Sequence, residues 1–306
     1  MSQQSFPPIA YVLLISLAAI WGASFLFIKV AVAAIPPMTL VAARLVLAAA
    51  AMLTYLWASG RRLPREGAIW RDFLAIALAG NIVPFVLISW GEVVIDSGLA
   101  AILMAIMPLS SLALAHVFTR DERLTPARVL GMIVGFTGIL VLVGPDVLAG
   151  LGREVLAQIA VAGAAVCYAI SNVYTRVRGV VALPASVTSS GVLLCAAVLS
   201  VPLSLIADRP WTLVPTVESL AALVILALVC TSLAYLILFR LISTTGATFV
   251  AFINYLVPVF GVVWGAVLLH EAIRPGALAG LGLILAGIAV SRYRPRRHGQ
   301  GDGDSR

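Results

Sequence analysis

Charge is scarce in this sequence, and lysine is almost missing. Asp, Glu, Lys and Arg make up only 11% of the 306 residues, and Lys29 is the single lysine. A soluble domain carries about 25% charged residues. This chain is instead 62% hydrophobic, with a mean hydropathy of +1.09. The composition therefore argues against a soluble enzyme, a disordered chain, a fibrous repeat or a secreted disulfide scaffold, and indicates a polytopic membrane protein.

The sequence also has few cysteines and lacks a basic segment at its N-terminus. The three cysteines all lie inside apolar runs without metal-ligand spacing, so we expect small buried side chains and neither a disulfide framework nor a metal or other cofactor. Residues 1–8 carry no basic group, and the apolar run that follows continues past Val30, which is too long for the core of a signal peptide. We expect this run to be a retained first span.

Long apolar runs are what the sequence has in abundance. A bilayer core of about 30 Å needs about 20 apolar residues per helix, and the chain offers ten such runs separated by short connectors. Period-2 alternation typical of a β-barrel is missing. The expected fold is an all-α polytopic membrane protein with ten transmembrane helices over residues 9–33, 37–59, 71–90, 97–118, 127–145, 155–175, 186–207, 217–239, 246–269 and 276–292.

A repeat divides these runs into two sets of five. In both halves a Glu is followed by Pro at +4 and Gly at +9 and +16, starting at Glu122 and at Glu271. Met107-Pro108 likewise parallels Val257-Pro258. We predict two units, 9–145 and 155–292. Since five is odd, the second unit must be inverted in the membrane, an arrangement found in many secondary transporters.

The positive charges predict the orientation. With both termini inside, fifteen of the twenty Lys and Arg residues fall on the cytoplasmic side, three fall outside, and Lys29 and Arg44 lie within spans. This bias satisfies the positive-inside rule. The basic tail, 293–306, is then a disordered cytoplasmic anchor of the topology, and no nucleic-acid partner is expected.

One segment of the first predicted helix and the duplicated pattern suggest a family. The segment Trp21-Gly-Ala-Ser-Phe-Leu-Phe-Ile-Lys29, with the duplicated Pro, Glu and Gly pattern, resembles the drug/metabolite transporter superfamily, and within it the ten-helix members with two EamA-type domains. The resemblance implies a bacterial inner-membrane carrier, often an exporter of amino acids or related metabolites. One departure is that Tyr168-Ala169 stands where the first half has Trp21-Gly22, so any site built from these pairs is asymmetric.

Two polar stripes are candidates for binding a small-molecule substrate. Each pairs an aromatic residue with hydroxyl or amide groups at helical spacing, which suits a small zwitterion with an apolar side chain. Packing and hydrogen bonding between helices is the alternative interpretation. The stripe residues are Trp21 and Ser24 in the first helix, and Tyr168, Ser171 and Asn172 in the sixth.

The two cations within spans have competing interpretations. Lys29 either lines the cavity and attracts a carboxylate or extends to the outer interface. The resemblance favours the first, because Lys29 stands at the basic position of the family motif. For Arg44 we favour a structural role, with its head group near the interface or bonded to carbonyls of a neighbouring helix.

Prolines inside spans mark candidate hinges and free carbonyls. Each proline removes a bond to the carbonyl four residues earlier, which must then find another partner. Pro84, Pro108 and Pro258 are the predicted hinges, with static kinks as the alternative. Asn81, Asn254 and Tyr255 near them are candidate substrate contacts, and Ser89, Trp90, Ser232 and Tyr235 are weaker additions.

The acidic and imidazole groups indicate no enzyme. His270-Glu271 begins an HExxH pattern, but Arg274 occupies the last position, so no zinc protease is expected. Glu122 and Glu271 at matching helix ends are expected to be solvated, with a proton relay as the less favoured alternative. Glu92 and Asp96 either bind a proton or are solvated.

The function predicted is a secondary transporter, most consistent with amino-acid export by alternating access between the two units. The rivals are a carrier of nucleotide sugars or other phosphorylated metabolites and, less favoured, an integral-membrane enzyme. The glycine-rich fifth and tenth helices are expected to be scaffold or a homodimer surface away from the cavity. The energy source is left open between the substrate gradient and the proton gradient.

Overall fold

The computed structural model describes residues 7–119, 125–148 and 152–292, and over these ranges the regular elements are all helices. In the first half they are α1 (Pro8–Val32), α2 (Pro37–Ala58), α3 (Gly67–Ala77), η1 (Leu78–Ile82), α4 (Val83–Glu92), α5 (Ser97–Leu103), η2 (Met104–Ile106), α6 (Met107–Phe118) and α7 (Pro126–Leu148). In the second half they are α8 (Arg153–Val177), η3 (Val180–Ala182), α9 (Ala185–Ala207), η4 (Pro210–Thr212), α10 (Val217–Ala227), η5 (Leu228–Leu233), α11 (Ala234–Thr245), α12 (Ala247–Val250), α13 (Ile253–Leu268) and α14 (Pro275–Arg292).

Seven continuous helical stretches in the described ranges are long and apolar enough to cross a membrane. Three shorter apolar helices, Pro126–Val141, Ile253–Leu268 and Pro275–Ser291, occupy the positions of the fifth, ninth and tenth predicted spans. The prediction of an all-helical polytopic membrane protein is therefore supported. Ten crossings and an inverted repeat stay predictions.

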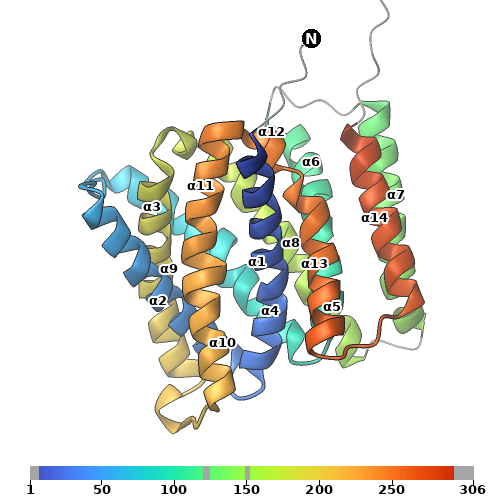
Figure 1. Cartoon of the computed structure of the whole chain (residues 1–306), viewed down its shortest axis with the longest axis horizontal. Helices are drawn as coiled ribbons and strands as arrows, with labels where there is room; N and C mark the ends of the chain where they lie inside the picture. The colour runs from blue at the N-terminus through green and yellow to red at the C-terminus, as the bar shows by residue number, and fades with distance from the viewer. Residues whose placement is uncertain (1–6, 120–124, 149–151, 293–306) are drawn as a thin grey trace, which may run out of the picture.

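The helices run side by side in one bundle and alternate in direction. The start of α1 and the end of α14 lie at the same end, at the top of Figure 1. We call this the near end; it contains Pro8 and Arg292. The far end contains Val32 and Pro275. The predicted tail, 293–306, and Glu122 lie outside the described residues.

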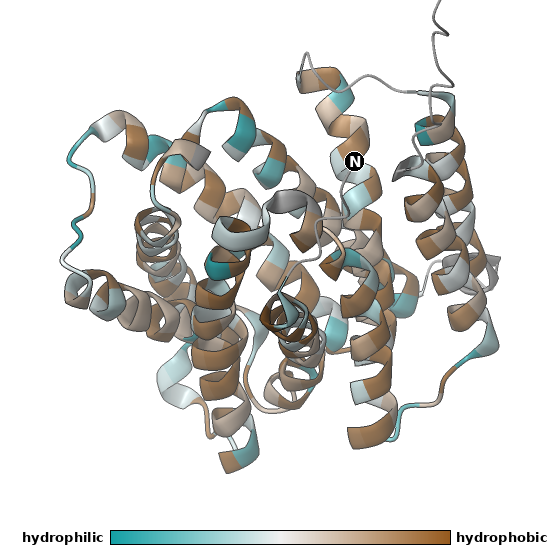
Figure 2. Ribbon diagram, turned by 45° about the horizontal axis from the view of Figure 1, so that its top comes forward, coloured by the Kyte–Doolittle hydropathy of each residue, from teal (hydrophilic) through white to brown (hydrophobic). Residues whose placement is uncertain are grey.

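Most residues along the helices of the bundle are hydrophobic, as Figure 2 shows by its brown colouring. Large hydrophobic side chains exposed at mid-helix include Leu140, Val198 and Val263. A soluble monomer rarely exposes such continuous apolar surface. Hydrocarbon chains of a bilayer are the environment that this surface fits.

Four of the helical stretches are irregular, three of them well inside the stretch and the fourth close to its start. α3 and α4 join through the π-helical turn η1, which ends two residues before Pro84, and α10 and α11 join through the π-helical turn η5. A tight turn, η2, lies between α5 and α6 before Pro108, and the helix breaks between α12 and α13, ahead of Pro258. The irregular turns fall at corresponding places in the two halves. Whether the three prolines act as hinges stays a prediction.

Helices α7 and α14 form a close pair at one edge of the bundle (Figure 1). Glycines permit this approach, because a Cβ at Gly138 would lie 2.7 Å from the carbonyl oxygen of Gly280. Gly131 and Gly287 meet in the same way. These glycine faces are thus occupied within the chain, so a homodimer, which stays a prediction, would need other faces of these helices.

Candidate functional site

The guanidinium of Arg44 lies buried inside the bundle. Arg44 is on α2 and only 6% exposed, and its Nε donates a hydrogen bond of 3.0 Å to the Thr231 hydroxyl. Its Cζ lies 4.0 Å from the centroid of the Phe85 ring, a cation–π distance. Among the described residues no other Lys or Arg is buried. Arg44 is therefore the one fixed positive charge in this part of the interior.

The hydroxyl that holds Arg44 is itself positioned by the π-helical turn η5. Thr231 donates to the carbonyl of Leu226 at 2.8 Å, and Ser232 donates to that of Ala227 at 3.0 Å. Both carbonyls lie five residues earlier, where the wider turn disturbs the regular hydrogen bonding. Because its proton is used on Leu226, the Thr231 oxygen is left to accept from Arg44. π-Helical turns occur frequently at functional sites.

Aromatic and amide groups surround this charge. The Tyr235 hydroxyl donates to Oδ1 of Asn81 at 3.4 Å, and Asn81 lies in the other π-helical turn, η1. The rings of Phe85 and Tyr168 meet edge to face, with centroids 6.4 Å apart. Tyr168 and Tyr235 both lie close enough to Arg44 to interact with it electrostatically. We call Arg44, Asn81, Phe85, Tyr168, Thr231 and Tyr235 the Arg44 cluster.

The cluster has unused hydrogen-bonding capacity on its cation. Among the described residues Nη1 and Nη2 of Arg44 have no hydrogen-bond partner and no ion pair. A guanidinium taken out of water is costly unless an anion pairs with it. A carboxylate accepts two parallel hydrogen bonds from such a fork. The arrangement is suited to binding one carboxylate beside aromatic faces.

Three of the predicted substrate contacts lie at or beside this cluster. Asn81 and Tyr168 belong to it. Ser171 is 5% exposed on α8 and packs on Gly80, where a Cβ would collide with its hydroxyl. Glycine at position 80 thus lets α8 approach the π-helical turn that carries Asn81.

The other predicted contacts lie elsewhere. Ser24 donates to the carbonyl of Trp21 within α1 at 2.6 Å, and Trp21 packs on an apolar cluster formed by α1, α11, α12 and α13. Asn254 donates to the carbonyl of Ala251 at 3.2 Å, at the break before α13, and Tyr255 packs on Phe252. Asn172 is exposed on α8. These five residues are therefore not brought into the Arg44 cluster.

The sequence patterns do not single out Phe85 or Thr231, and they favour a structural role for Arg44. One signal was available, because Arg44 is the only arginine well inside a predicted span. An intramembrane cation is by default a functional candidate. The sequence does not reveal that Thr231 accepts a hydrogen bond from Arg44, because the two residues lie 187 positions apart.

Lys29 lies at the far end and binds backbone. Its ammonium donates to the carbonyls of Glu92 and Ile95, both at 2.8 Å, where α4 ends. A cation is favoured at a helix C-terminus, where carbonyls lack partners. Glu271 likewise accepts from the backbone N–H groups of Ser97 and Gly98, at 2.8 and 2.9 Å, at the start of α5.

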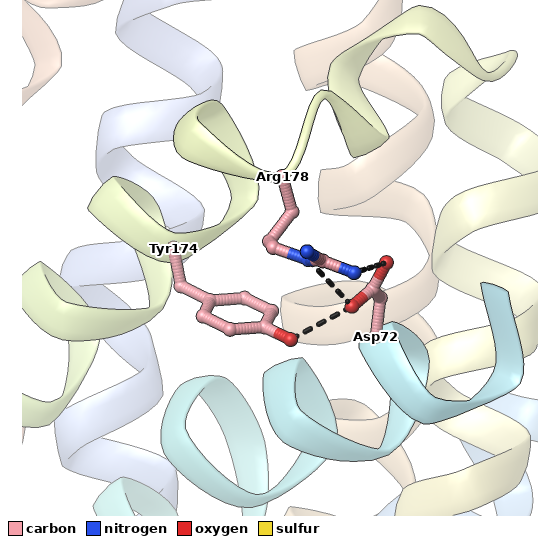
Figure 3. A network of polar contacts seen from close by, with 3 residues as sticks. All are labelled: Asp72, Tyr174 and Arg178. Atoms are coloured by element: carbon pink, nitrogen blue, oxygen red, sulfur yellow. Dashed lines mark hydrogen bonds and ion pairs between the residues drawn. The ribbon is translucent and has the colours of Figure 1, made fainter. Parts of the chain in front are cut away.

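Polar contacts join the two halves at the near end. Asp72 of α3 accepts from the Tyr174 hydroxyl at 2.7 Å and from Nε of Arg178 at 3.0 Å, as Figure 3 shows. Arg61 also donates to the Ser186 hydroxyl at 2.7 Å. Since the Asp72 side chain is only 9% exposed, these bonds hold its carboxylate in a largely dry setting.

Comparison with known proteins gives a consistent result. The model of the EamA-like transporter family matches residues 8–144 and again 155–293. The chain is 22% identical over 280 residues to the uncharacterized transporter YoaV of Bacillus subtilis, covering 92% of this chain and 95% of the relative. It is 27% identical to the uncharacterized inner membrane transporter YedA of Escherichia coli, covering 90% and 88%.

Two further matches extend the comparison. A probable terminal-alkyne amino-acid exporter of Streptantibioticus cattleyicolor is 35% identical over 125 residues, which is 40% of each chain. A solved crystal structure with 21% sequence identity superposes with a TM-score of 0.68, covering 95% of this chain and 99% of the other. That structural likeness shows the fold.

Proposed function

Because the chain belongs to the EamA-like transporter family, we propose that it exports a small amphipathic metabolite with one carboxylate, most simply an amino acid. Transport rather than catalysis is its role, as in the named relatives. The carboxylate binds the free edge of the Arg44 guanidinium. The aromatic rings of Phe85 and Tyr168 face the apolar part of the substrate, and Asn81 and Tyr235 offer polar contacts.

The observation that carries this proposal is the buried Arg44 guanidinium, two of whose nitrogen atoms have no partner among the described residues. One buried cation balances one carboxylate. A nucleotide sugar or other phosphate ester carries two or more negative charges and would need more cations at the site. The partial match to a probable amino-acid exporter agrees with this choice.

Alternating access fits the distribution of contacts between the halves. The Asp72–Arg178 contact joins them at the near end, and the Glu271 contacts with Ser97 and Gly98 join them at the far end. The Arg44 cluster, with groups from both halves, lies between the two. Breaking one end contact while the other holds would open the cluster to one side of the membrane at a time.

The orientation proposed has the near end in the cytoplasm of a bacterial inner membrane. The described arginines at the far end are Arg153, Arg209 and Arg274, whereas the near end has Arg61, Arg62, Arg65, Arg71, Arg128, Arg176, Arg178, Arg240 and Arg292. The positive-inside rule then assigns both termini to the cytoplasm.

An efflux screen tests the function. Cells expressing the protein are loaded with dipeptides, which peptidases cleave, and the amino acids released to the medium are measured. We expect faster release of one class of amino acid, lost in Arg44→Gln and kept in Arg240→Gln, an exposed arginine on α11. Release that is the same in cells with and without the protein would contradict amino-acid export.

A further inference from the structure

Glu92, the last residue of α4, is fully enclosed. Its exposed fraction is 0%, and neither Oε1 nor Oε2 has a hydrogen-bond partner among the described residues. No described cation forms an ion pair with it within 4 Å. The carboxyl group therefore lies buried in a protein interior without the bonds that a carboxylate requires.

Three charged groups face Glu92 from the elements around it. They are Lys29 on α1, Arg44 on α2 and Glu271 from the connector before α14. Helix α5 carries no charged residue, and Arg153 and Glu154 of α8 are exposed. Glu92 thus has two cations and one acid as electrostatic neighbours.

Two of these charges, Lys29 and Glu271, are already engaged with backbone groups. The Lys29 ammonium donates to the backbone carbonyl of Glu92 and to that of Ile95, rather than to the Glu92 carboxyl. Glu271 accepts two backbone N–H groups of α5. Neither neighbour therefore compensates a negative charge on Glu92 by direct contact.

An ionised carboxylate in this setting would be strongly disfavoured. Removing an unpaired charge from water costs several kcal/mol or more, and a buried acid avoids the cost by holding its proton. In this conformation Glu92 is accordingly a neutral carboxylic acid. A buried acid in a membrane transporter is a functional candidate by default.

We propose that Glu92 is the binding site of a proton whose movement drives transport. This rests on the proposed function. The O–H bond of the Glu92 carboxyl breaks when water reaches it, the proton passes to that water, and the carboxylate that remains is free to pair with Lys29. On reprotonation the O–H bond forms again, and the conformation described here is restored.

The position of Glu92 explains how loss of its proton would affect the contact between the two halves. Pairing with the ionised carboxylate would draw Lys29 away from the two carbonyls that it caps. Those carbonyls end α4 next to Ser97, where Glu271 joins the two halves. Loss of the proton would therefore loosen the contact that closes the far end.

The first test examines the proton directly on purified protein in detergent. Infrared spectra at neutral pH should show the C=O stretch of a protonated carboxylic acid, lost in Glu92→Gln. It should persist in Glu154→Gln, an exposed acid in the first turn of α8 at the same end. A wild-type spectrum without this band, or a band that survives in Glu92→Gln, would overturn the proposal. This readout needs no substrate, so it stands even if amino-acid transport is not observed.

The second test measures coupling in proteoliposomes with radiolabelled L-leucine, L-phenylalanine and L-threonine. Exchange of labelled for unlabelled amino acid without a pH gradient reports the proposed function alone. With one pH unit across the membrane, wild type and Glu154→Gln should build up to about a tenfold gradient of substrate per coupled proton. Glu92→Gln should lose accumulation, and any exchange that it retains should no longer respond to pH.

The outcomes separate the two proposals. Exchange without any response to the pH gradient in wild type, or an equal response in Glu92→Gln, would overturn proton coupling through Glu92. No exchange of any amino acid in wild type would instead contradict the proposed function, and the infrared result would then decide for Glu92. If Glu92→Gln does not fold, Glu92→Asp should retain coupling with an altered pH profile, and an unaltered profile would count against the proposal.

Discussion

The Nε atom of Arg44 lies 3.0 Å from the hydroxyl oxygen of Thr231, so a cation of the first half is held by a hydroxyl of the second. The bond leaves the other two guanidinium nitrogens without a described partner. It also fixes the plane of the guanidinium over the Phe85 ring. The same contact thus orients a binding group and links the two halves at the centre of the bundle.

Substitution of Arg44 should weaken substrate binding. Arg44→Lys keeps the charge but loses the planar fork, and Arg44→Gln loses both. A hydrogen bond to a charged group contributes about 1.5–3 kcal/mol, so we expect affinity to fall by about ten- to a hundredfold in Arg44→Gln and less in Arg44→Lys. Competition binding on purified protein measures this, with Arg240→Gln as the unaffected control. Equal affinity in all variants would remove Arg44 from the site.

Thr231→Val should destabilise the protein, whereas Thr231→Ser should not. Valine has nearly the same shape but leaves the Arg44 Nε without its acceptor and the Leu226 carbonyl without its extra donor. A buried group deprived of its partner costs about 1–3 kcal/mol. Thermal unfolding in detergent compares the two variants. Similar melting temperatures would show that the hydroxyl is dispensable.

Loss of the Asp72–Arg178 contact should favour opening of the near end. The Arg178 side chain is 43% exposed, so solvent screens the pair and its loss should change a two-state equilibrium by only about a few-fold. Spin labels at Trp57 and Val177, two exposed positions near that end, report the separation of the halves. Asp72→Asn should increase the population with the longer distance.

A matched control for this measurement is Glu66→Gln, an exposed acid at the same end. It should leave the distance distribution as in wild type. If Asp72→Asn also left it unchanged, the contact would have no part in closing the near end.

A side chain at Gly138 should prevent the close approach of α7 and α14. Its Cβ would lie within 3 Å of the Gly280 carbonyl and the Ile284 amide nitrogen, and backbone atoms cannot move aside easily. Overpacking of this kind costs about 1–3 kcal/mol. Gly138→Val should therefore lower the melting temperature. Gly282→Val, where no atom lies within 4 Å of the added Cβ, is the control expected to match wild type.

Helix positions were largely predictable, because long apolar runs between Pro, Gly and charged residues leave few alternatives. The predicted span 37–59 is the helix Pro37–Ala58, and 97–118 is the continuous stretch Ser97–Phe118. Composition alone does not tell whether the shorter apolar helices cross a membrane, since their length is near the limit for a span.

The candidate site was only partly predictable. Pro84 predicts an irregular turn near Asn81. In contrast, η5 contains no proline, and nothing in its sequence indicates a π-helical turn. Spacing also placed Asn172 on the same stripe as Tyr168, yet Asn172 is exposed. A stripe specifies a direction around one helix, whereas membership of the Arg44 cluster depends on which neighbouring helices pack there.

The two π-helical turns have a mechanical consequence. Each takes up one residue more than a regular α-helical turn, so the helix beyond it is out of register with the helix before it. Returning such a turn to α-helix would advance one part of the helix by about 1.5 Å and rotate it by about 100°. Each π-helical turn is therefore a point where one part of a helix can translate and rotate relative to the other. Asn81 lies in the turn between α3 and α4, and Thr231 lies in the turn between α10 and α11.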